Sequence, residues 1–376
     1  SRNVDARPQL NELIPRYRSL ESQLDQPSVI VGMADQGPGF DMPVYAGGDP
    51  DQPTSLAKRG YLSCLANIVD TPQSRGSGRA LLAEYIATDR NPLTARVMAN
   101  RIWHYLFGKG LVKSVDNFGE LGDRPSHPKL LDYLARDFID GGWSVKSLIR
   151  QTVLSDTFPQ SSTVDKVAAQ LDPENRLLHH YPSRRLEAEV IRDSILAVNG
   201  RLNLKAGGAS IFPELSKEVL ATQSRPGRGW NQSSQEEQAR RSVYIYIKRT
   251  LTVPLLDSFD QPTPDQPTPL RATTTIAPQA LILLNSHFMD KNATAFAERL
   301  VKEAGPEARR QVALAYNLAL LRQPDKREEE IALRFLEEQQ KEFASLDPDT
   351  PKATEKRALV AMCRLLFNLN EFVYLD

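Results

Sequence analysis

The sequence lacks several features that would identify a chemical function. Only two of its 376 residues are cysteines, Cys64 and Cys363, and they lie far apart. We expect both to be free thiols in the core, because unpaired cysteine is among the most buried residue types. No C-x-x-C-H sequence occurs, so this chain attaches no c-type haem. A run of about 18 apolar residues is also absent, which argues against a membrane-spanning helix.

An excess of charge of either sign is missing as well. The chain has 47 Lys and Arg residues against 47 Asp and Glu residues, which argues against a nucleic-acid binder that works through bulk charge. It contains no H-E-x-x-H, no G-K-[ST] and no G-x-S-x-G sequence, so a dedicated zinc site has weak support, and neither a phosphate loop nor a hydrolase elbow is indicated. We therefore predict no metal, no cofactor and no nucleic-acid partner, although loop oxygens around Asp49 and Asp51 leave a calcium site open.

Helical periodicity is the main pattern that is present. It begins with a short amphipathic segment at 8–24, and it continues almost without interruption over 80–158. Within the second stretch, Asn91, Ser126 and Ser144 are placed to start three helices, and glycines end the first two, which predicts an antiparallel bundle. Further helices are expected at 183–200, from Pro278 onward, and three times within 306–376, one of them with a capping box of Asp325 and Glu328.

Strand patterns are few. They occur near 42–48 and near 242–249, where Val243, Ile245 and Ile247 alternate with polar or aromatic neighbours. Because a strand needs a partner for its backbone, we expect these two segments to pair. The chain is thus predicted to be mainly α, a helical bundle-like domain with a small β-sheet and long ordered loops. The predicted divisions are an N-terminal helix and junction segment with a strand at 1–74, a helical core domain at 75–305 and a C-terminal helical subdomain at 306–376.

One charged group stands out on the helix expected at 183–200. Arg185, Glu189 and Arg192 follow at spacings of four and three, and Asp193 lies four residues after Glu189. Two carboxylates held together by arginines could perform general acid–base chemistry, as in glycoside cleavage. The same pattern is typical of an ion-pair lattice that docks a helix, and we favour that interpretation.

The helix that starts near Asn91 carries a second polar group. It consists of residues within five consecutive positions, namely Asn100, Arg101, Trp103 and His104. Trp103 is expected to be buried, because its ring is the largest apolar surface there. His104 could act as a proton shuttle, with Arg101 as a binding residue, although a single histidine is more often a structural group.

The sequence SRPGRGWNQSS lies in a long aperiodic segment. Arg225 and Arg228 flank Trp230, and we expect this tryptophan to be exposed. Arginine beside an aromatic ring is suited to an anionic sugar or a partner protein. The alternative is a Trp230 that plugs the core. If a functional site exists, we expect it where the segments 91–112, 184–199 and 223–231 converge.

Six stretches of the sequence together resemble a known family. They are NPLTARVMANRIWHYLFGKGLVKSVDNFG, GDRPSHPKLLDYLA, RRLEAEVIRDSIL, SRPGRGW, RRSVYIYIKR and APQALILLNSHF, in this order. They resemble the planctomycete-type domain of unknown function that closes long bacterial envelope proteins, in which a cytochrome c domain often lies upstream. The resemblance covers roughly residues 75–376.

The resemblance implies a periplasmic, cell-surface or secreted location in a bacterium that handles complex polysaccharides. It supplies no catalytic residue, because the family has no established chemistry. Two functions then compete. The favoured one is a binding or scaffold module of a larger protein, with a polysaccharide or an envelope protein as its partner. The alternative is a polysaccharide-active hydrolase or lyase that uses Glu189 and Asp193 with Arg185, Arg192 and His104.

Overall fold

The structure is a computed structural model of the whole chain. It forms two compact units, Ser1–Thr94 and Ala95–Asp376, which are described separately. Cys64 and the division predicted near residue 74 lie outside the residues that the structure describes. The described residues are 7–23, 32–35, 37, 39–60, 76–346 and 351–375.

The first unit contains two helices and a β-hairpin. The helices are α1 (Arg7–Gln23) and α2 (Arg79–Ile86), and the first confirms the amphipathic helix expected at 8–24. Strand β1 (Met42–Tyr45) pairs antiparallel with β2 (Pro53–Ala57). The predicted partner of β1 was therefore wrong. A strand eight residues away closes through a short turn, which costs much less chain entropy than pairing across about 200 residues.

The segment near 242–249 is not a regular strand. It starts with the 3₁₀ turn η3 (Ser242–Tyr244) and touches the rest of the chain through isolated bridges, one of them between Ile245 and Ile211. Of the three alternating apolar residues only Ile245 is buried. The ring of the neighbouring Tyr244 lies 4.0 Å from the guanidinium group of Arg240. The alternation in the sequence therefore reflects one buried residue between exposed neighbours.

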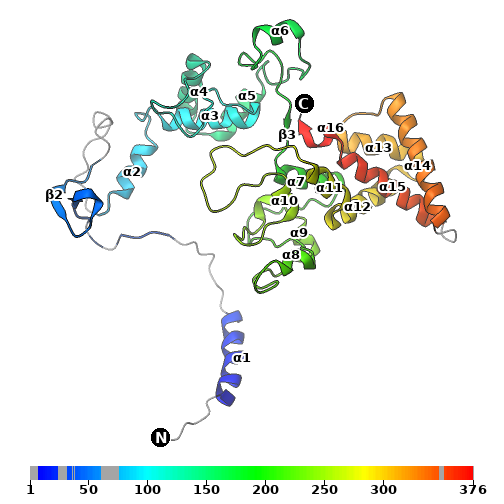
Figure 1. The fold of residues 1–376 in the computed structure, drawn as a ribbon, viewed down its shortest axis with the longest axis horizontal. Coiled ribbons are helices and arrows are strands. Elements are labelled where there is room, and N and C mark those ends of the chain that lie inside the picture. Colours follow the sequence, from blue (N-terminus) through cyan, green and yellow to red (C-terminus); the bar gives the residue numbers. More distant parts are fainter. Residues whose placement is uncertain are drawn as a thin grey trace. The chain divides into compact units, whose positions relative to one another are not determined.

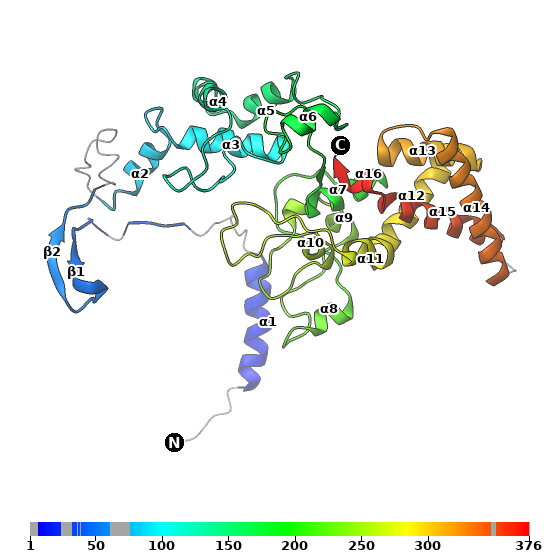
Figure 2. The ribbon, with the colours of Figure 1, turned by 45° about the horizontal axis from the view of Figure 1, so that its top comes forward.

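The N-terminal part of the second unit is a small helical body. Its helices are α3 (Thr94–Phe107), α4 (Pro128–Asp140), α5 (Val145–Val153) and α6 (Lys166–Leu171). Helices α3, α4 and α5 lie together (Figure 2), and their apolar faces share one core. Phe107 and Leu148 are almost completely buried in it. Ser144 caps α5 by accepting a hydrogen bond from the Ser147 backbone. The three helices predicted in this region are confirmed.

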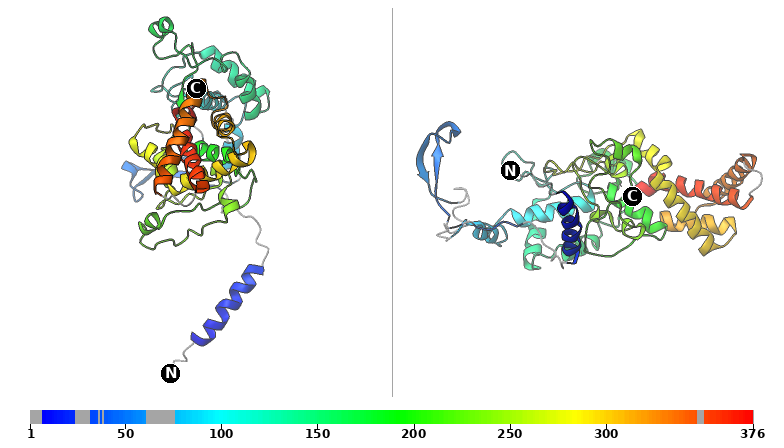
Figure 3. Two further views of the ribbon diagram at one scale, coloured as in Figure 1. Left: turned by 90° about the vertical axis from the view of Figure 1, so that its right-hand side faces the viewer. Right: turned by 90° about the horizontal axis from the view of Figure 1, so that it is seen from below.

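A larger helical body follows, with α12 to α15 packed against one another (Figures 1 and 3). Its core extends from α7 to the C-terminal residues and crosses the division predicted at 305. Cys363 is a free thiol in this core, as expected, and burial raises its pKa. Asp325 and Glu328 form the predicted capping box at the start of α14. The elements are α7 (Ala188–Val198), α8 (Lys217–Ala221), α9 (Gln235–Gln238), α10 (Pro254–Ser258), α11 (Ala277–Asn285), α12 (His287–Ala304), α13 (Ala308–Leu320), α14 (Lys326–Leu346), α15 (Pro351–Phe367) and α16 (Asn370–Val373).

The helix expected at 183–200 begins later than predicted. Arg184 and Arg185 form the short strand β3, which pairs with β4 (Tyr374–Leu375) beside the C-terminus (Figure 1). Helix α7 starts only at Ala188. Arg185 is therefore not on one helical ridge with Glu189, which corrects the spacing argument. The fold class is mainly α, as the sequence predicted.

Candidate functional site

Arg185, Glu189, Arg192 and Asp193 form what we call the α7 cluster. Arg185 projects from β3 with only 4% of its side chain exposed. Its Nη2 donates to the Asp260 carboxylate at 2.6 Å, and its guanidinium group lies over the ring of Phe259. A buried cation needs such partners, because leaving it unpaired would cost several kcal/mol, on the order of 3–5. Arg185 thus ties β3 to the segment that follows α10.

Arg192 and Asp193 are committed to a second docking contact. The Arg192 guanidinium donates to the carbonyl oxygens of Gln238 and Arg240 and to the hydroxyl of Ser242. Burial lowers the pKa of Arg192 to about 10, so the group stays protonated at neutral pH. Asp193 accepts hydrogen bonds from the backbone and the hydroxyl of Ser242, at 2.8 and 2.7 Å. Both residues therefore fasten the segment before η3 onto α7.

Glu189 also has a fixed partner. Its carboxylate accepts a hydrogen bond from Arg271 at 2.6 Å, and the same guanidinium lies 3.5 Å from the Glu187 carboxylate. Each predicted catalytic carboxylate is thus held by a neighbouring side chain. These contacts join α7 to neighbouring segments, and the catalytic role of the two carboxylates stays a prediction.

The polar residues of α3 have mainly packing roles. Asn100 is fully buried, and its side chain both accepts from the backbone N–H of Val112 and donates to the Val112 carbonyl. Trp103 packs on the ring of Phe107, whereas Arg101 is exposed. The pKa of His104 is lowered by burial and by the nearby Arg184 cation, which favours its neutral form.

The loop with two arginines and a tryptophan differs from its prediction. Trp230 is only 6% exposed, packs edge-on against Phe212 and donates from Nε1 to the Pro213 carbonyl at 2.9 Å. The expectation of an exposed Trp230 was wrong, and the core-plug alternative holds. Arg225 and Arg228 are exposed on the same loop. The sequence could not show this, because Phe212 and Pro213 precede Trp230 by more than a helical turn in an aperiodic segment.

The expected convergence is met only in part. Near the end of α3, Tyr181 donates from its hydroxyl to the Leu106 carbonyl, and His104 lies beside Arg184. The loop at 223–231 instead makes its contacts with Phe212, Pro213 and Lys248. Arg192 of the α7 cluster and Pro213, the hydrogen-bond acceptor of Trp230, nevertheless both line the same hollow beside α12.

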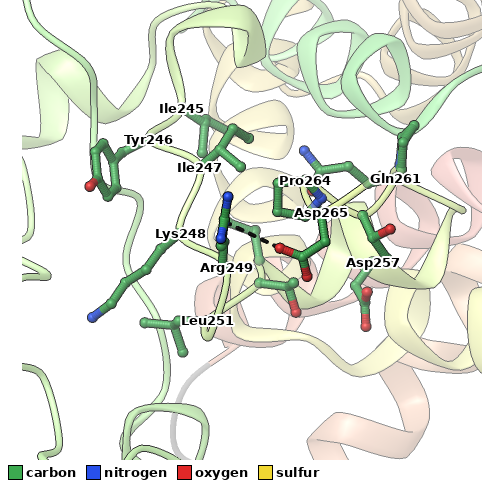
Figure 4. Close-up of a pocket in the computed structure, with 14 residues that line it drawn as sticks. Ile245, Tyr246, Ile247, Lys248, Arg249, Leu251, Asp257, Gln261, Pro264 and Asp265 are labelled. Carbon is green, nitrogen blue, oxygen red and sulfur yellow. Dashed lines mark ion pairs between the residues drawn. The ribbon is translucent and has the colours of Figure 1, made fainter. Parts of the chain in front are cut away.

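A small cavity lies between η3 and the Pro-rich segment after α10. Figure 4 shows Arg249 pointing toward Asp265, with 3.2 Å between the charged atoms, while Lys248 extends to the other side. The cavity volume is about 80 Å³. This is far below the several hundred Å³ typical of ligand pockets, so we assign it no ligand.

A much larger hollow runs beside the first turns of α12. We call it the α12 groove, and its volume is about 950 Å³. One wall is the segment around Glu214, which Trp230 supports through the adjacent Pro213 carbonyl. Another is α9 with its flanks, and the floor includes Phe288 and Asn292. A volume near the upper end of the usual range of about 300–1,000 Å³ suits a ligand of several units.

The α12 groove is lined by polar groups that remain accessible. Glu214 forms an ion pair with Lys291, and its Oε1 atom lies 3.6 Å from Nε2 of His287. The hydrogen bond from the Lys291 cation keeps the pKa of Glu214 below its ordinary value. Arg201 is exposed, and its guanidinium forms no ion pair within the described part of the chain. The groove thus offers a carboxylate, cations and amides on several sides.

No pattern in the sequence indicated this groove. Arg201, Glu214, Gln235 and Lys291 are far apart along the chain, and none lies in a recognisable motif. Within the described ranges, no group of three or more His, Cys, Asp or Glu side chains could hold a metal ion. No described helix is long and apolar enough to span a membrane.

Comparison with known families places the chain. Residues 78–336, more than half of its length, match the family described as PSD1, Protein of unknown function (DUF1553). The chain belongs to that family. No curated protein and no solved structure shows a significant match.

Proposed function

We propose that this member of the PSD1 family is a non-catalytic binding module that holds an extended polysaccharide in the α12 groove. The module would be part of a larger exported protein of a bacterial envelope. The groove is the observation that carries the proposal. Its volume of about 950 Å³ suits a chain of several sugar units rather than a single small metabolite.

The chemistry of the groove supports a sugar ligand. Hydroxyl groups need both donors and acceptors, and the groove presents Gln232, Gln235, Glu214 and Lys291 at its surface. The half-buried ring of Phe288 adds an apolar face for a sugar ring. Acceptors, donors and one aromatic ring in the same groove would orient a polar chain.

The state of the α7 cluster supports binding without turnover. Glycoside cleavage needs one carboxylic acid and one carboxylate that face the scissile bond. Glu189 and Asp193 are instead engaged by Arg271 and by Ser242. Each carboxylate is therefore held by a contact within the protein.

The proposed location rests on the resemblance of the six sequence stretches to the domain that closes long envelope proteins. An exported module that binds a polysaccharide would hold its parent protein at the cell surface or in the periplasm. The balanced charge of the chain fits a partner recognised by hydrogen bonds rather than by a strong overall field.

Isothermal titration with neutral hexasaccharides, such as cellohexaose and xylohexaose, would test the proposal. Binding of at least one is expected, and Lys291→Ala should weaken it about tenfold, because hydrogen bonds to charged groups contribute roughly 1.5–3 kcal/mol. Lys302→Ala on the same helix is the matched control, since Lys302 is exposed and does not line the groove. Equal losses in the two variants, or no binding at all, would contradict the proposal.

The same oligosaccharides would test the absence of catalysis. We expect no release of reducing sugar over prolonged incubation. If turnover is found and Glu189→Gln abolishes it while circular dichroism and the melting temperature stay unchanged, the α7 cluster is catalytic and the non-catalytic part of the proposal fails.

A further inference from the structure

A second hollow lies in the small helical body and shares no lining residue with the α12 groove. Its volume is about 180 Å³. It lies among three chain segments, 109–113, 123–126 and 174–178, with Trp103 also in its lining. We call it the basic pocket, because four of its lining side chains are cations. They are Lys109, Lys113, Arg124 and Arg176.

The first wall of the basic pocket is fixed by buried contacts. The amide of Asn100 forms two hydrogen bonds with the backbone of Val112, at 2.8 and 3.0 Å. Gly110 lets the chain come this close, since a Cβ atom there would lie 2.5 Å from the Val112 carbonyl oxygen and 2.8 Å from the Asn100 amide. Ser126 adds a backbone hydrogen bond to Leu111 at 2.8 Å. The lysines that flank this loop are thus carried on a rigid support.

The opposite wall is fixed in a similar way. The Asp172 carboxylate accepts hydrogen bonds from the backbone N–H groups of Arg176 and Leu177, at 2.9 and 2.7 Å. Asn175, directly before Arg176, has a φ of 51°, which is a left-handed conformation. Its side chain stabilises this conformation by donating a hydrogen bond to the His180 carbonyl. Such local side-chain bonds hold a tight turn in one shape. Both walls are therefore organised before any ligand arrives.

The lining of the pocket has a net positive charge. Four cations face two acids, Asp123 and Glu174. Glu174 is occupied, because its carboxylate accepts from Lys113 at 2.7 Å and its carbonyl accepts from Lys109 at 3.2 Å. The exposed guanidinium groups of Arg124 and Arg176 form no hydrogen bond or ion pair within the described segments. At least two cations are thus available to a ligand.

We propose that the basic pocket binds the anionic group of an acidic sugar, either a sulfate ester or a carboxylate. A pocket of about 180 Å³ is smaller than the several hundred Å³ of a site for a large ligand, so it suits one charged group with its sugar ring. Guanidinium and ammonium groups form strong charge-assisted hydrogen bonds with both anions. Rigid walls reduce the entropy lost on binding.

The proposal does not depend on the α12 groove, because the two sites share no residue and take different ligands. A neutral oligosaccharide would test the groove, whereas a charged monosaccharide tests the basic pocket. If the hexasaccharides fail to bind, the inference about the pocket is unaffected, and the converse also holds.

Saturation-transfer NMR titrations of the intact chain with glucose 6-sulfate, glucuronate and glucose would test it. Binding of at least one anionic sugar and none of glucose is expected at low salt, and the stronger of the two anions identifies the source. The double variant Lys113→Ala/Arg124→Ala should weaken that binding about tenfold or more. The matched control is Lys146→Ala/Arg150→Ala, which removes an exposed lysine and arginine of α5 that lie outside the pocket.

A variant that should raise the affinity shows that weaker binding in the double variant is not caused by misfolding. Glu174→Gln removes the carboxylate that competes for Lys113, so it should raise the affinity for the anionic sugar a few-fold. The proposal is overturned if neither anion binds, if glucose binds as well as the anions, or if the pocket variants and the control variants bind alike.

Discussion

The α7 cluster and the α12 groove are built from the same residue types but satisfy their charges in different ways. In the α7 cluster, 4% of the Arg185 side chain and 3% of the Arg192 side chain are exposed, and their partners are carbonyls and carboxylates of the protein itself. In the groove, Lys291 and Glu214 are 44% and 35% exposed. A buried charge cannot exchange its partner without a large penalty, whereas an exposed pair is weak and can do so.

The difference shows which charged residues can serve a ligand. The α7 cluster joins β3, α7 and the segment before η3, and its loss would release these elements from one another. The groove residues contribute little to stability and remain available. A cluster of arginines and carboxylates in a sequence thus indicates that these side chains form ion pairs or hydrogen bonds. Their burial decides whether the partner is another part of the protein or a ligand.

The largest effect is expected when the α7 cluster is broken. Arg192→Met should lower the free energy of unfolding by about 3–5 kcal/mol, because three buried acceptors lose their donor. These acceptors are the carbonyls of Gln238 and Arg240 and the hydroxyl of Ser242. Urea unfolding followed by circular dichroism would measure the loss.

The matched control for this prediction is Arg201→Met at the edge of the groove. Arg201 is exposed, so its replacement should change the free energy of unfolding by less than about 0.5 kcal/mol. Similar losses in the two variants would show that burial does not separate the two regions.

A somewhat smaller effect on stability is expected at Trp230. This residue is buried like the α7 cluster, but it also supports a wall of the α12 groove. Trp230→Ala should cost about 3 kcal/mol, the lower end for truncation of a buried aromatic residue, and should lower the melting temperature. It should also weaken hexasaccharide binding, because the indole supports the Pro213 carbonyl next to Glu214 in the groove wall.

Trp230→Phe separates the two contributions of this residue. It keeps a ring against Phe212 and loses only the hydrogen bond to Pro213, so it should cost about 1–2 kcal/mol. An unchanged melting temperature in Trp230→Ala together with lost binding would instead identify an exposed anchor and restore the original expectation.

The smallest effect concerns an ion pair at the surface that belongs neither to the α7 cluster nor to the α12 groove. Arg322 holds the carboxylate of Glu328 through two hydrogen bonds of 2.7 Å. The hydrogen bonds from this guanidinium lower the pKa of Glu328 from 4.5 to about 2. The pKa is depressed in the folded state, so the stabilisation is present above about pH 4.5 and is lost as the pH falls toward 2.

Both side chains of this pair are about a third exposed, so solvent limits its contribution to about 1 kcal/mol. Wild-type chain and Glu328→Gln should differ by about this amount in free energy of unfolding near pH 6 and converge near pH 2.5. Glu330→Gln, at an exposed position without an ion pair in the described ranges, should show no such pH dependence. A difference that persists at low pH would contradict the assignment.

The sequence predicted the helical elements well where local signals agreed. The apolar stripe of α3, the Ser144 cap of α5 and the capping box of Asp325 and Glu328 all appear in the structure. Prediction was poorer where the outcome depended on distant partners. The start of α7 was displaced because Arg184 and Arg185 pair with the C-terminal strand β4, which no local pattern reveals.

The candidate sites show the same limit. The sequence singled out Arg185, Glu189, Arg192 and Trp230 by type and spacing, and the structure engages all four in internal contacts. It gave no indication of Glu214 and Lys291, which the fold brings together from positions far apart in the chain.

The sequence by itself determined that this chain is mainly α, where several of its helices begin and end, and which family it resembles. These properties depend on residues within a few turns of one another, where periodicity and capping act directly. Only the tertiary structure decided which charges are buried, that Trp230 lies in the core, and that a groove and a basic pocket exist. Burial and cavities arise from packing between distant segments, and the free energy of a charge depends on that packing rather than on its neighbours in sequence.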